Sequence, residues 1–386
     1  MERTSLQPSR FTQYIRTYSN QRLEWLAIDS FKDALHSLSA GLPPNEEYIV
    51  ALLSAGTEQM PELLSAADRM RRREVGEAVH LRAIIEFSNF CRKNCLYCGL
   101  RRDNRSLPRY RLTEQQILDA AGEAAVLGFR TVVLQSGEDP YYRPADIARV
   151  VEKIKSSCDL AVTLSLGEHS RQTYKIWREA GADRYLLKQE TADERLFKYL
   201  KPDTSLSKRV QCLCWLKELG YQTGSGNMVG LPGQSLHTLA QDIMLMQELD
   251  VDMAGIGPFL PHPATPLKDA APGGLELTLK TLALTRICLP QAHLPATTAL
   301  CTLTTDGRRM ALSGGANVIM PNLTPPAVRS KYLIYPQKAD ISEKPAVALA
   351  EITALLAEMG RPLASGPGHA TKTNRKSFFT DDKSDK

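Results

Sequence analysis

The spacing of apolar and polar residues changes once along the chain, near Leu81. Before that point, apolar residues recur at helical spacing over Gln21–Leu38, Asn45–Ser54 and Pro61–Arg73, and Pro43-Pro44 separates the first two stretches. After it, short runs rich in β-branched and aromatic residues alternate with amphipathic stretches of about ten to fifteen residues. We therefore expect a helical extension followed by a domain of alternating strands and helices.

The alternating region predicts a parallel β-sheet built from βαβ units. Strands are expected at Leu81–Phe87, Thr131–Gln135, Leu160–Ser165, Arg184–Leu187, Tyr221–Val229, Asp252–Ile256, Pro295–Thr298 and Asn317–Met320. Helices are expected at Thr113–Leu127, Pro144–Ser156, Arg171–Ala180, Ser205–Leu219, Ser235–Leu249, Glu276–Leu289 and Asp306–Ser313. Eight such repeats over about 240 residues have the size of a complete (β/α)8 TIM-type barrel. An open doubly wound sheet is the alternative, although no G-x-G-x-x-G follows the first strand to mark a dinucleotide-binding version.

The chain divides into four expected segments. Residues 1–80 form the N-terminal helical extension, 81–335 the barrel, 336–364 a C-terminal helical segment that closes the barrel, and 365–386 a disordered tail. The tail is expected because it has few apolar residues beyond Phe378-Phe379, too few to bury against a core.

Composition narrows the functional classes without choosing among them. The 386 residues are 43% hydrophobic and 24% charged, as in an ordinary soluble globular protein. The net charge of +5 is too small to indicate nucleic-acid or membrane binding, and no 18-residue apolar run predicts a membrane span. Met1–Ser9 has no apolar signal-peptide core, so we expect a cytoplasmic protein. In that reducing compartment, eight cysteines indicate buried thiols, a metal site or catalysis rather than a disulfide framework.

Three of the eight cysteines are grouped, and the other five are expected to be small buried hydrophobic residues. Cys91, Cys95 and Cys98 follow the first predicted strand with the spacing C-x3-C-x2-C. In a barrel this loop lies at the carboxyl-terminal rim, where barrel enzymes carry out their chemistry. Three thiolates on a four-iron cluster leave one iron to which a substrate or cofactor can bind. A zinc or structural thiol site is the alternative, but no His or fourth Cys follows at zinc-finger spacing.

This spacing, with the aromatic Tyr97 before the last cysteine, resembles the signature of radical S-adenosylmethionine (SAM) enzymes. Runs spread from Ile84–Asn89 to Gly314–Asn322 resemble the [FeFe]-hydrogenase maturases of the HydE type, whereas biotin synthase and methylornithine synthase share fewer of them. The resemblance implies one [4Fe–4S] cluster on the three grouped cysteines, with SAM completing its fourth iron. A second cluster, found in some members, is not expected because residues 336–360 contain no cysteine.

The resemblance also implies a set of SAM-binding residues at the ends of successive strands. The set is Tyr97, Ser136, Gly137, Glu138, Glu168, Lys188 and Met228. The Ser-Gly-Glu run resembles the family's element for the methionine amino group, although by itself it would be an ordinary strand-end turn. Lys188 stands where the family tends to have an arginine that pairs with the methionine carboxylate, and lysine keeps the charge without the bidentate fork.

Four residues at the ends of the last two predicted strands are expected to face the substrate side of the cavity. They are Thr297, Thr298, Met320 and Asn322. Adjacent threonine hydroxyls and backbone N–H groups can bind an anion, so the expected substrate is a small anionic molecule. Ordinary strand packing is the alternative for the two threonines.

The implied function is that of a radical SAM enzyme, which reductively cleaves SAM to a 5′-deoxyadenosyl radical. The HydE-type resemblance implies a role in maturing the hydrogenase H-cluster, on a small sulfur- or iron-containing precursor. The implied partners are a reductant such as ferredoxin or flavodoxin and other hydrogenase maturation proteins. The alternatives are a biotin-synthase-like or methylornithine-synthase-like activity on another small molecule and, from a different class, a non-catalytic iron–sulfur carrier.

Overall fold

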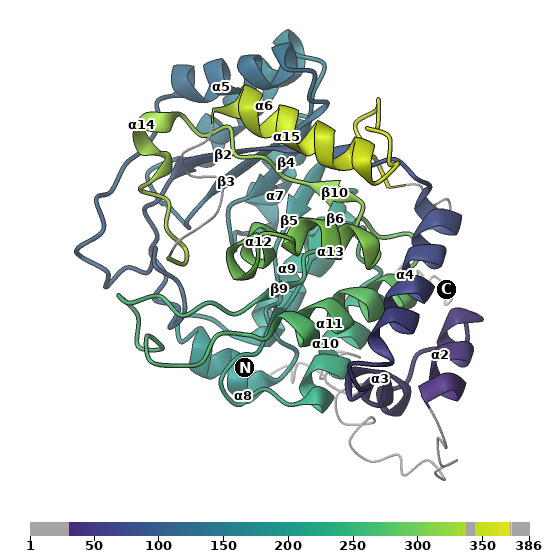
Figure 1. The fold of residues 1–386 in the computed structure, drawn as a ribbon. Helices are drawn as coiled ribbons and strands as arrows, with labels where there is room; N and C mark the ends of the chain where they lie inside the picture. Colours follow the sequence, from purple (N-terminus) through teal and green to yellow (C-terminus); the bar gives the residue numbers. More distant parts are fainter. Residues whose placement is uncertain (1–30, 337–343, 371, 373–386) are drawn as a thin grey trace, which may run out of the picture.

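A parallel sheet of six strands forms the centre of the molecule in the computed structural model, which describes residues 31–336, 344–370 and 372 (Figure 1). The strand order is β2-β3-β4-β5-β6-β8, and each adjacent pair is parallel. The bounds are β2 (Ala83–Ser88), β3 (Thr131–Ser136), β4 (Ala161–Ser165), β5 (Arg184–Leu186), β6 (Gln222–Ser225) and β8 (Met253–Ala254). Neighbours in the sheet are therefore also neighbours in the chain, as successive βαβ units require. The predicted α/β class is confirmed.

Two further parallel pairs lie outside this sheet, and single bridges connect other segments. The pairs are β1 (His80–Leu81) with β10 (Val318–Ile319), and β7 (Met228–Val229) with β9 (Gly257–Pro258). Single parallel bridges join Met253 to His293, Pro295 to Val318, and Ile84 to Asn322. The strand expected at Pro295–Thr298 is reduced to one of these bridges, because α12 (Thr298–Leu303) begins with Thr297 as its N-cap residue.

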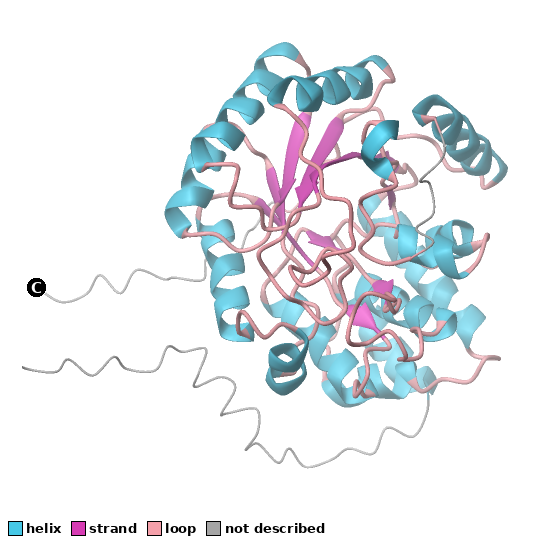
Figure 2. Cartoon of the chain, turned by 90° about the vertical axis from the view of Figure 1, so that its left-hand side faces the viewer, coloured by secondary structure: helices cyan, strands magenta, loops and turns pink. Residues whose placement is uncertain are grey.

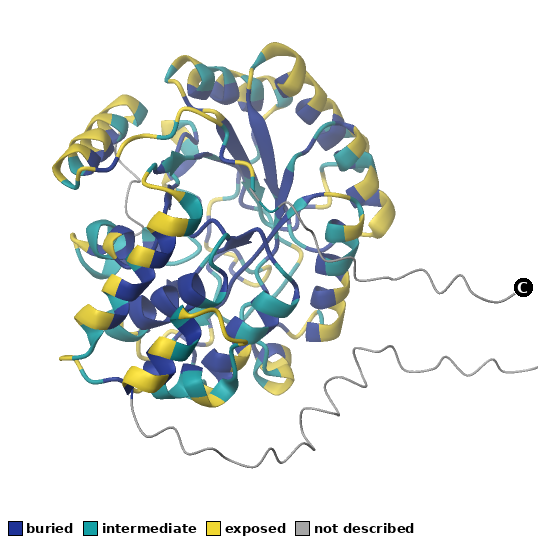
Figure 3. Ribbon diagram, turned by 90° about the vertical axis from the view of Figure 1, so that its right-hand side faces the viewer, coloured by how far each residue is buried: buried dark blue, intermediate teal, exposed yellow. Residues whose placement is uncertain are grey.

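Helices surround the strands, which are buried between them (Figures 2 and 3). Those at predicted positions are α5 (Glu114–Val126), α6 (Pro144–Ser157), α7 (Arg171–Glu179), α9 (Leu206–Glu218), α10 (Leu236–Glu248), α11 (Leu275–Cys288) and α13 (Gly307–Ser313). Helix α8 (Glu194–Leu200), between β5 and α9, is an addition to the prediction. The continuous apolar runs in the strands fit this arrangement. When both faces of a parallel sheet are covered, the side chains on both sides of each strand are buried.

The N-terminal helices pack against the later helices of the domain. These helices are α2 (Phe31–Ser39), α3 (Glu46–Leu53) and α4 (Met60–Val75). Helix α4 lies along α11, and α3 lies along α10 (Figure 1). The first ten residues of the helix expected from Gln21 lie outside the described residues. Among the helices of the described residues, none is long and apolar enough to cross a membrane.

The C-terminal segment returns to the strands after α15 (Pro345–Glu358), with the four-residue helix α14 (Pro326–Arg329) preceding it. Residues 365–370 and Lys372, expected in a disordered tail, instead contact the sheet. The buried Arg184 donates a hydrogen bond to the carbonyl of Pro367 (2.7 Å), and Lys372 pairs with Asp250 (2.7 Å). These contacts are polar, so a prediction based on apolar content misses them. The rest of the expected tail lies outside the described residues.

Candidate functional site

The three grouped cysteines lie on the long loop between β2 and α5, at the carboxyl end of the sheet. Arg109 organises this loop, since its guanidinium donates hydrogen bonds to the carbonyls of Asn89, Leu100, Arg101 and Asn104. All three thiols are free and partly buried. Burial raises the pKa of the Cys91 and Cys98 thiols, and the neighbouring cysteines add to this effect. Much of the water is therefore excluded from the Cys91 and Cys98 thiols.

Gly137 lets the cysteine loop approach the end of β3. A Cβ atom at this position would lie 2.3 Å from the carbonyl oxygen of Phe90 and 2.7 Å from the Cβ atom of Cys91. Both distances are far inside van der Waals contact, so any larger residue must displace the loop. The Gly137 N–H donates to the Ser88 carbonyl (3.2 Å), and the Ser136 hydroxyl lies 2.7 Å from the Gly137 carbonyl. The predicted Ser-Gly-Glu run is thus in direct contact with the first cysteine.

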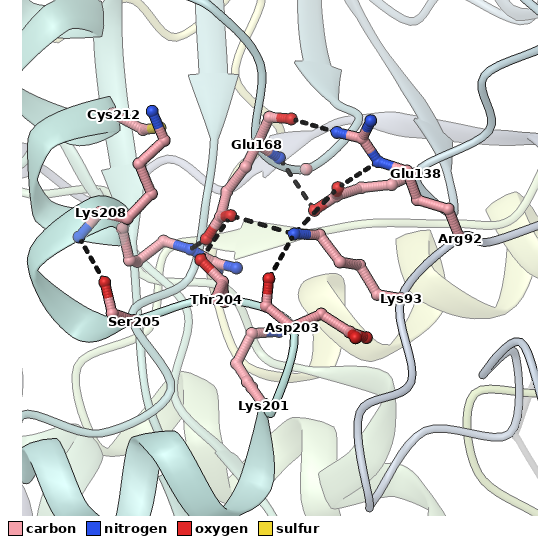
Figure 4. Close-up of polar contacts among 12 residues, drawn as sticks. Arg92, Lys93, Glu138, Glu168, Lys201, Asp203, Thr204, Ser205, Lys208 and Cys212 are labelled. Atoms are coloured by element: carbon pink, nitrogen blue, oxygen red, sulfur yellow. Dashed lines mark hydrogen bonds and ion pairs between the residues drawn. The ribbon is translucent and has the colours of Figure 1, made fainter.

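Glu138 and Glu168 form the acidic centre of a charged network beside the loop (Figure 4). The Oε1 atom of Glu138 accepts the Glu168 backbone N–H (3.0 Å), and its Oε2 atom accepts Arg92 Nε (3.2 Å). Lys93, between the first two cysteines, lies 3.3 Å from Glu168 and 3.6 Å from Glu138. Gly167 allows this contact, since a Cβ there would lie 2.1 Å from the Glu138 Cγ atom.

Arg209 is the buried cation of this network, and it is not among the site residues predicted from the sequence. Its Nε donates to Glu168 Oε1 (2.8 Å), its Nη1 donates to the Lys188 carbonyl, and its side chain is 4% exposed. Lys188 itself is 28% exposed, and its Nζ lies 3.7 Å from Glu190. A signal for Arg209 was present, because it shares the buried face of α9 with Leu206, Val210 and other apolar residues.

Tyr97 and Lys201 lie on the other side of the loop. The Tyr97 hydroxyl donates to Glu190 Oε1 (3.2 Å) and accepts from Lys201 Nζ (3.1 Å). Lys201 also donates to the sulfur of Cys95 (3.2 Å). Met228 and Tyr97 pack against a small apolar cluster of Leu200, Leu231, Phe259 and Leu267. Two of the predicted SAM-binding residues therefore share one apolar surface next to the thiols.

The residues predicted on the substrate side come from two adjacent segments. The bridge between Pro295 and Val318 places the segments that carry Thr297 and Met320 side by side. The Thr297 hydroxyl donates to the Ile256 carbonyl (3.2 Å), and Thr298 is the first residue of α12. Asn322 is buried, and its amide donates to Glu86 (3.0 Å). Both Thr297 and Asn322 thus have hydrogen-bond partners within the protein.

An open pocket of about 840 Å³ lies beside the charged network, outside the thiols. Four cations line it, Arg92, Lys93, Lys198 and Lys208, together with Glu168 and Asp203. Arg92 and Lys93 pair with the two glutamates, whereas Lys198 and Lys208 form no ion pair with a carboxylate of the described residues. The pocket therefore carries uncompensated positive charge on its outer side.

Comparison with known proteins identifies relatives of the whole domain. Residues 85–246 match the model of the radical SAM superfamily. The [FeFe] hydrogenase maturase subunit HydE of Thermotoga maritima is 54% identical over 299 residues, which are 78% of this chain and 86% of that protein. The 3-methylornithine synthase of Methanosarcina acetivorans is 30% identical over 72% of this chain and 79% of its own length. The crystal structure of methylornithine synthase (PylB), 27% identical, superposes with a TM-score of 0.75 over 86% of this chain and 97% of that one.

Proposed function

Because the chain belongs to the HydE family of radical SAM enzymes, we propose that it helps to assemble the active-site H-cluster of an [FeFe] hydrogenase, on a small sulfur- or iron-containing precursor. The observation that carries this proposal is the three-cysteine loop at the carboxyl end of the parallel sheet, in contact with the Ser-Gly-Glu run. A methylornithine-synthase-like activity is the second candidate, and the lower identity of 30% to that enzyme makes it the weaker one.

The cysteine loop fits the [4Fe–4S] cluster that the family uses. It offers three thiolates, the ligand type that iron–sulfur clusters take. In the part of the chain that the structure describes, no three His, Cys, Asp or Glu side chains are grouped as ligands of a single metal ion. The buried ammonium of Lys201 beside Cys95 adds positive charge where a thiolate-bound cluster adds negative charge. When bound, the reduced cluster supplies the electron that cleaves SAM to methionine and a 5′-deoxyadenosyl radical.

The charged network suits the methionine end of SAM, which carries an ammonium and a carboxylate. We assign the ammonium to Glu138, because among the described residues its Oε2 atom pairs only with Arg92 and Lys93, and the Arg92 side chain is 52% exposed. We assign the carboxylate to Arg209. Its Nη2 atom donates no hydrogen bond to the described residues, and the planar guanidinium group has the geometry that binds carboxylates. Lys188 remains the alternative cation for the carboxylate. Glu168 holds Arg209 in place.

The apolar surface of Tyr97 and Met228 suits the adenine ring. Flat aromatic and thioether side chains give such a ring contact area without competing hydrogen bonds. On the far side, Thr297, Thr298, Met320 and Asn322 are proposed to contact the substrate, which we propose to be small and anionic. The adjacency of the segments that carry Thr297 and Met320 supports a shared role for these residues.

We further propose that the strands close into a complete (β/α)8 barrel around the substrate. Six parallel strands and the β1–β10 pair support this, together with the bridges at His293, Pro295 and Asn322, which would connect β8 to β2 through the last segments. Closure has a chemical purpose, since a radical formed inside must be kept from water and from outside groups.

The reductant is proposed to be an acidic electron-carrier protein such as a ferredoxin or flavodoxin, in the cytoplasm. The pocket with Lys198 and Lys208 supports this, because it opens beside the cysteine loop and carries uncompensated cations. Charge reversal at both lysines should slow reduction of the cluster by an acidic carrier at least tenfold at low salt, because electrostatic attraction dominates such encounters. Reduction by dithionite should be unchanged. Equal rates with the protein carrier would contradict this docking site.

The function is tested with anaerobically reconstituted protein. Addition of dithionite and SAM should yield 5′-deoxyadenosine, and serine in place of any of the three cysteines should remove both iron and SAM cleavage. Cys301→Ser is the matched control, because Cys301 lies on α12 outside the cysteine loop. A maturation mixture that lacks a HydE-type protein should regain hydrogenase activity when this protein is added. If the cluster is intact but no 5′-deoxyadenosine forms, the non-catalytic iron–sulfur carrier is the remaining function. If SAM is cleaved but hydrogenase activity is not restored, the enzyme acts on another substrate.

A further inference from the structure

Lys201 is a buried lysine that contacts the cysteine loop. Lys201 is 7% exposed, and its ammonium forms no ion pair with a carboxylate of the described residues. Its three ammonium protons have two acceptors, the Cys95 sulfur at 3.2 Å and the Tyr97 hydroxyl at 3.1 Å. A buried ammonium costs several kcal/mol unless a counter-charge is near. Of its direct contacts, only Cys95 as a thiolate can supply that charge, and Glu190, bonded to the same Tyr97 hydroxyl, adds a negative charge farther away.

The backbone around Lys201 is fixed to the cysteine loop. Lys201 follows the last residue of α8, and its N–H donates to the carbonyl of Phe197 (2.9 Å). One residue earlier, the Leu200 carbonyl accepts a hydrogen bond from the Leu96 N–H (2.9 Å). Leu96 directly follows Cys95 in the chain. Leu96 and Tyr97 also pack against the apolar cluster that contains Leu200. The backbone that carries Lys201 is therefore tied to the second half of the cysteine loop, which places the start of the lysine side chain close to Cys95.

A hydrogen bond and a positive charge at a ligand sulfur have a predictable effect on an iron–sulfur cluster. Reduction adds one negative charge to the cluster and its thiolates, and hydrogen bonds to the sulfurs are among the features that set the reduction potential. A fixed cation in a low-dielectric site stabilises the more negative, reduced form. The ammonium of Lys201 should therefore raise the potential and make reduction easier.

We propose that Lys201 is a positioning residue that binds the Cys95 sulfur of the cluster and raises the cluster's reduction potential. This inference rests on the proposed function, since it requires the cluster on Cys91, Cys95 and Cys98. It adds the residue that follows α8, far from the cysteines in the sequence, to those that determine how readily the cluster accepts an electron.

The test is a redox titration of reconstituted protein followed by electron paramagnetic resonance, with iron content measured on the same samples. In Lys201→Met and Lys201→Gln, the ratio of reduced to oxidised cluster at a fixed solution potential should fall at least tenfold, a shift of about 59 mV for one electron. Lys201→Arg keeps the charge and should stay within about threefold of the unaltered protein. Lys175→Met, on the exposed side of α7, is the matched control and should leave the potential unchanged.

The outcomes separate the two proposals. If the unaltered protein holds no cluster, the proposed function fails. If Lys201→Met holds a full cluster at an unchanged potential, the role of Lys201 is wrong while the function stands. If both neutral variants lose the cluster but Lys201→Arg retains it, the positive charge is needed to hold Cys95, as proposed. If Lys201→Arg loses the cluster as well, the lysine acts through its shape alone and the proposal is overturned.

Discussion

Glu168 is a buried carboxylate that binds two cations of the site, Arg209 and Lys93. Its two carboxylate oxygens accept from Arg209 (2.8 Å), Thr204 (2.7 Å) and Lys93 (3.3 Å). Burial by itself would raise the pKa of this carboxyl, but Arg209, Thr204 and Lys93 outweigh it and lower the pKa from 4.5 to about 2. The side chain is therefore an anion throughout the range in which the protein would work.

This shift makes a prediction about stability and pH. Below pH 4.5 the unfolded chain protonates Glu168 while the folded chain does not, so the stability from this group is lost as the pH falls from about 4.5 to about 2. The loss is at most about 3.5 kcal/mol, at about 1.4 kcal/mol for each unit by which the pKa is lowered. It is measured as the free energy of unfolding in urea for the unaltered protein and Glu168→Gln. The difference between the two should shrink as the pH falls through this window, and a constant difference would contradict the prediction.

A second prediction at this scale concerns which cation binds the SAM carboxylate. Arg209→Lys keeps the charge but loses the planar fork, so the dissociation constant of SAM should rise at least tenfold, the value of one charged hydrogen bond of about 1.5 kcal/mol. Lys188→Met should change it less than about threefold. Calorimetric titration of SAM into reconstituted protein measures both. A stronger effect at Lys188 would restore the original expectation for that residue.

Residue types at fixed spacing could be predicted, whereas contacts between distant segments could not. The three cysteines and the Ser-Gly-Glu run lie together as their positions after successive strands required. Arg209 on α9 and Lys201, the residue after α8, escaped prediction because both contact the site from segments distant in sequence, and Lys201 is 106 residues from the cysteine that it contacts. A long side chain can reach a strand end from a helix, and no local pattern in the chain records this.

At the scale of elements, the close approach of β3 to the cysteine loop depends on Gly137. We predict that Gly137→Ala reduces the iron content after reconstitution by at least half, because the new methyl group must displace Phe90 and Cys91. Gly122→Ala is the matched control, since a Cβ at that position in α5 meets no atom within 4 Å and alanine favours the helix. Iron and circular dichroism are measured on both variants. Full iron content in Gly137→Ala would show that the loop can shift without losing the cluster site.

Most elements could be predicted because strands and helices of this domain bury apolar residues at different periods. The stretch Pro295–Thr298 is the exception, and its threonines explain why. Threonine favours strands but is also common at the residue before a helix, where Thr297 stands, although its hydroxyl donates to the Ile256 carbonyl and makes no capping hydrogen bond. Local sequence does not decide between these uses. The hydrogen bond from the Ala296 N–H to the Val318 carbonyl (2.9 Å), a contact across the fold, keeps only the start of this stretch extended.

At the scale of the whole molecule, the C-terminal segment is part of the domain. It holds the amino end of the sheet, opposite the cysteine loop, where Arg184 of β5 is fully buried without an ion pair to a carboxylate of the described residues. Arg184 donates to the Pro367 carbonyl and lies 3.0 Å from His369 Nδ1, while the Ala370 N–H donates to Gln222 of β6 (2.9 Å). Burial lowers the pKa of Arg184 to about 10, so it remains charged and needs these acceptors.

Truncation after Ala364 should therefore destabilise the protein by about 2–4 kcal/mol. The buried guanidinium of Arg184 loses hydrogen-bond acceptors worth about 1.5–3 kcal/mol each, and this loss is partly offset because the removed segment no longer has to be ordered on folding. The midpoint of thermal unfolding should fall by several degrees. Truncation after Lys372 is the matched control, since it keeps every contact from Ser365 to Lys372 and should unfold at the same temperature as the full chain. Arg184→Met in the shorter protein should recover part of the loss by removing the unpaired charge. If truncation after Ala364 leaves the unfolding temperature unchanged, the segment does not stabilise the sheet. If both truncations lower it equally, the stabilising residues lie beyond Lys372.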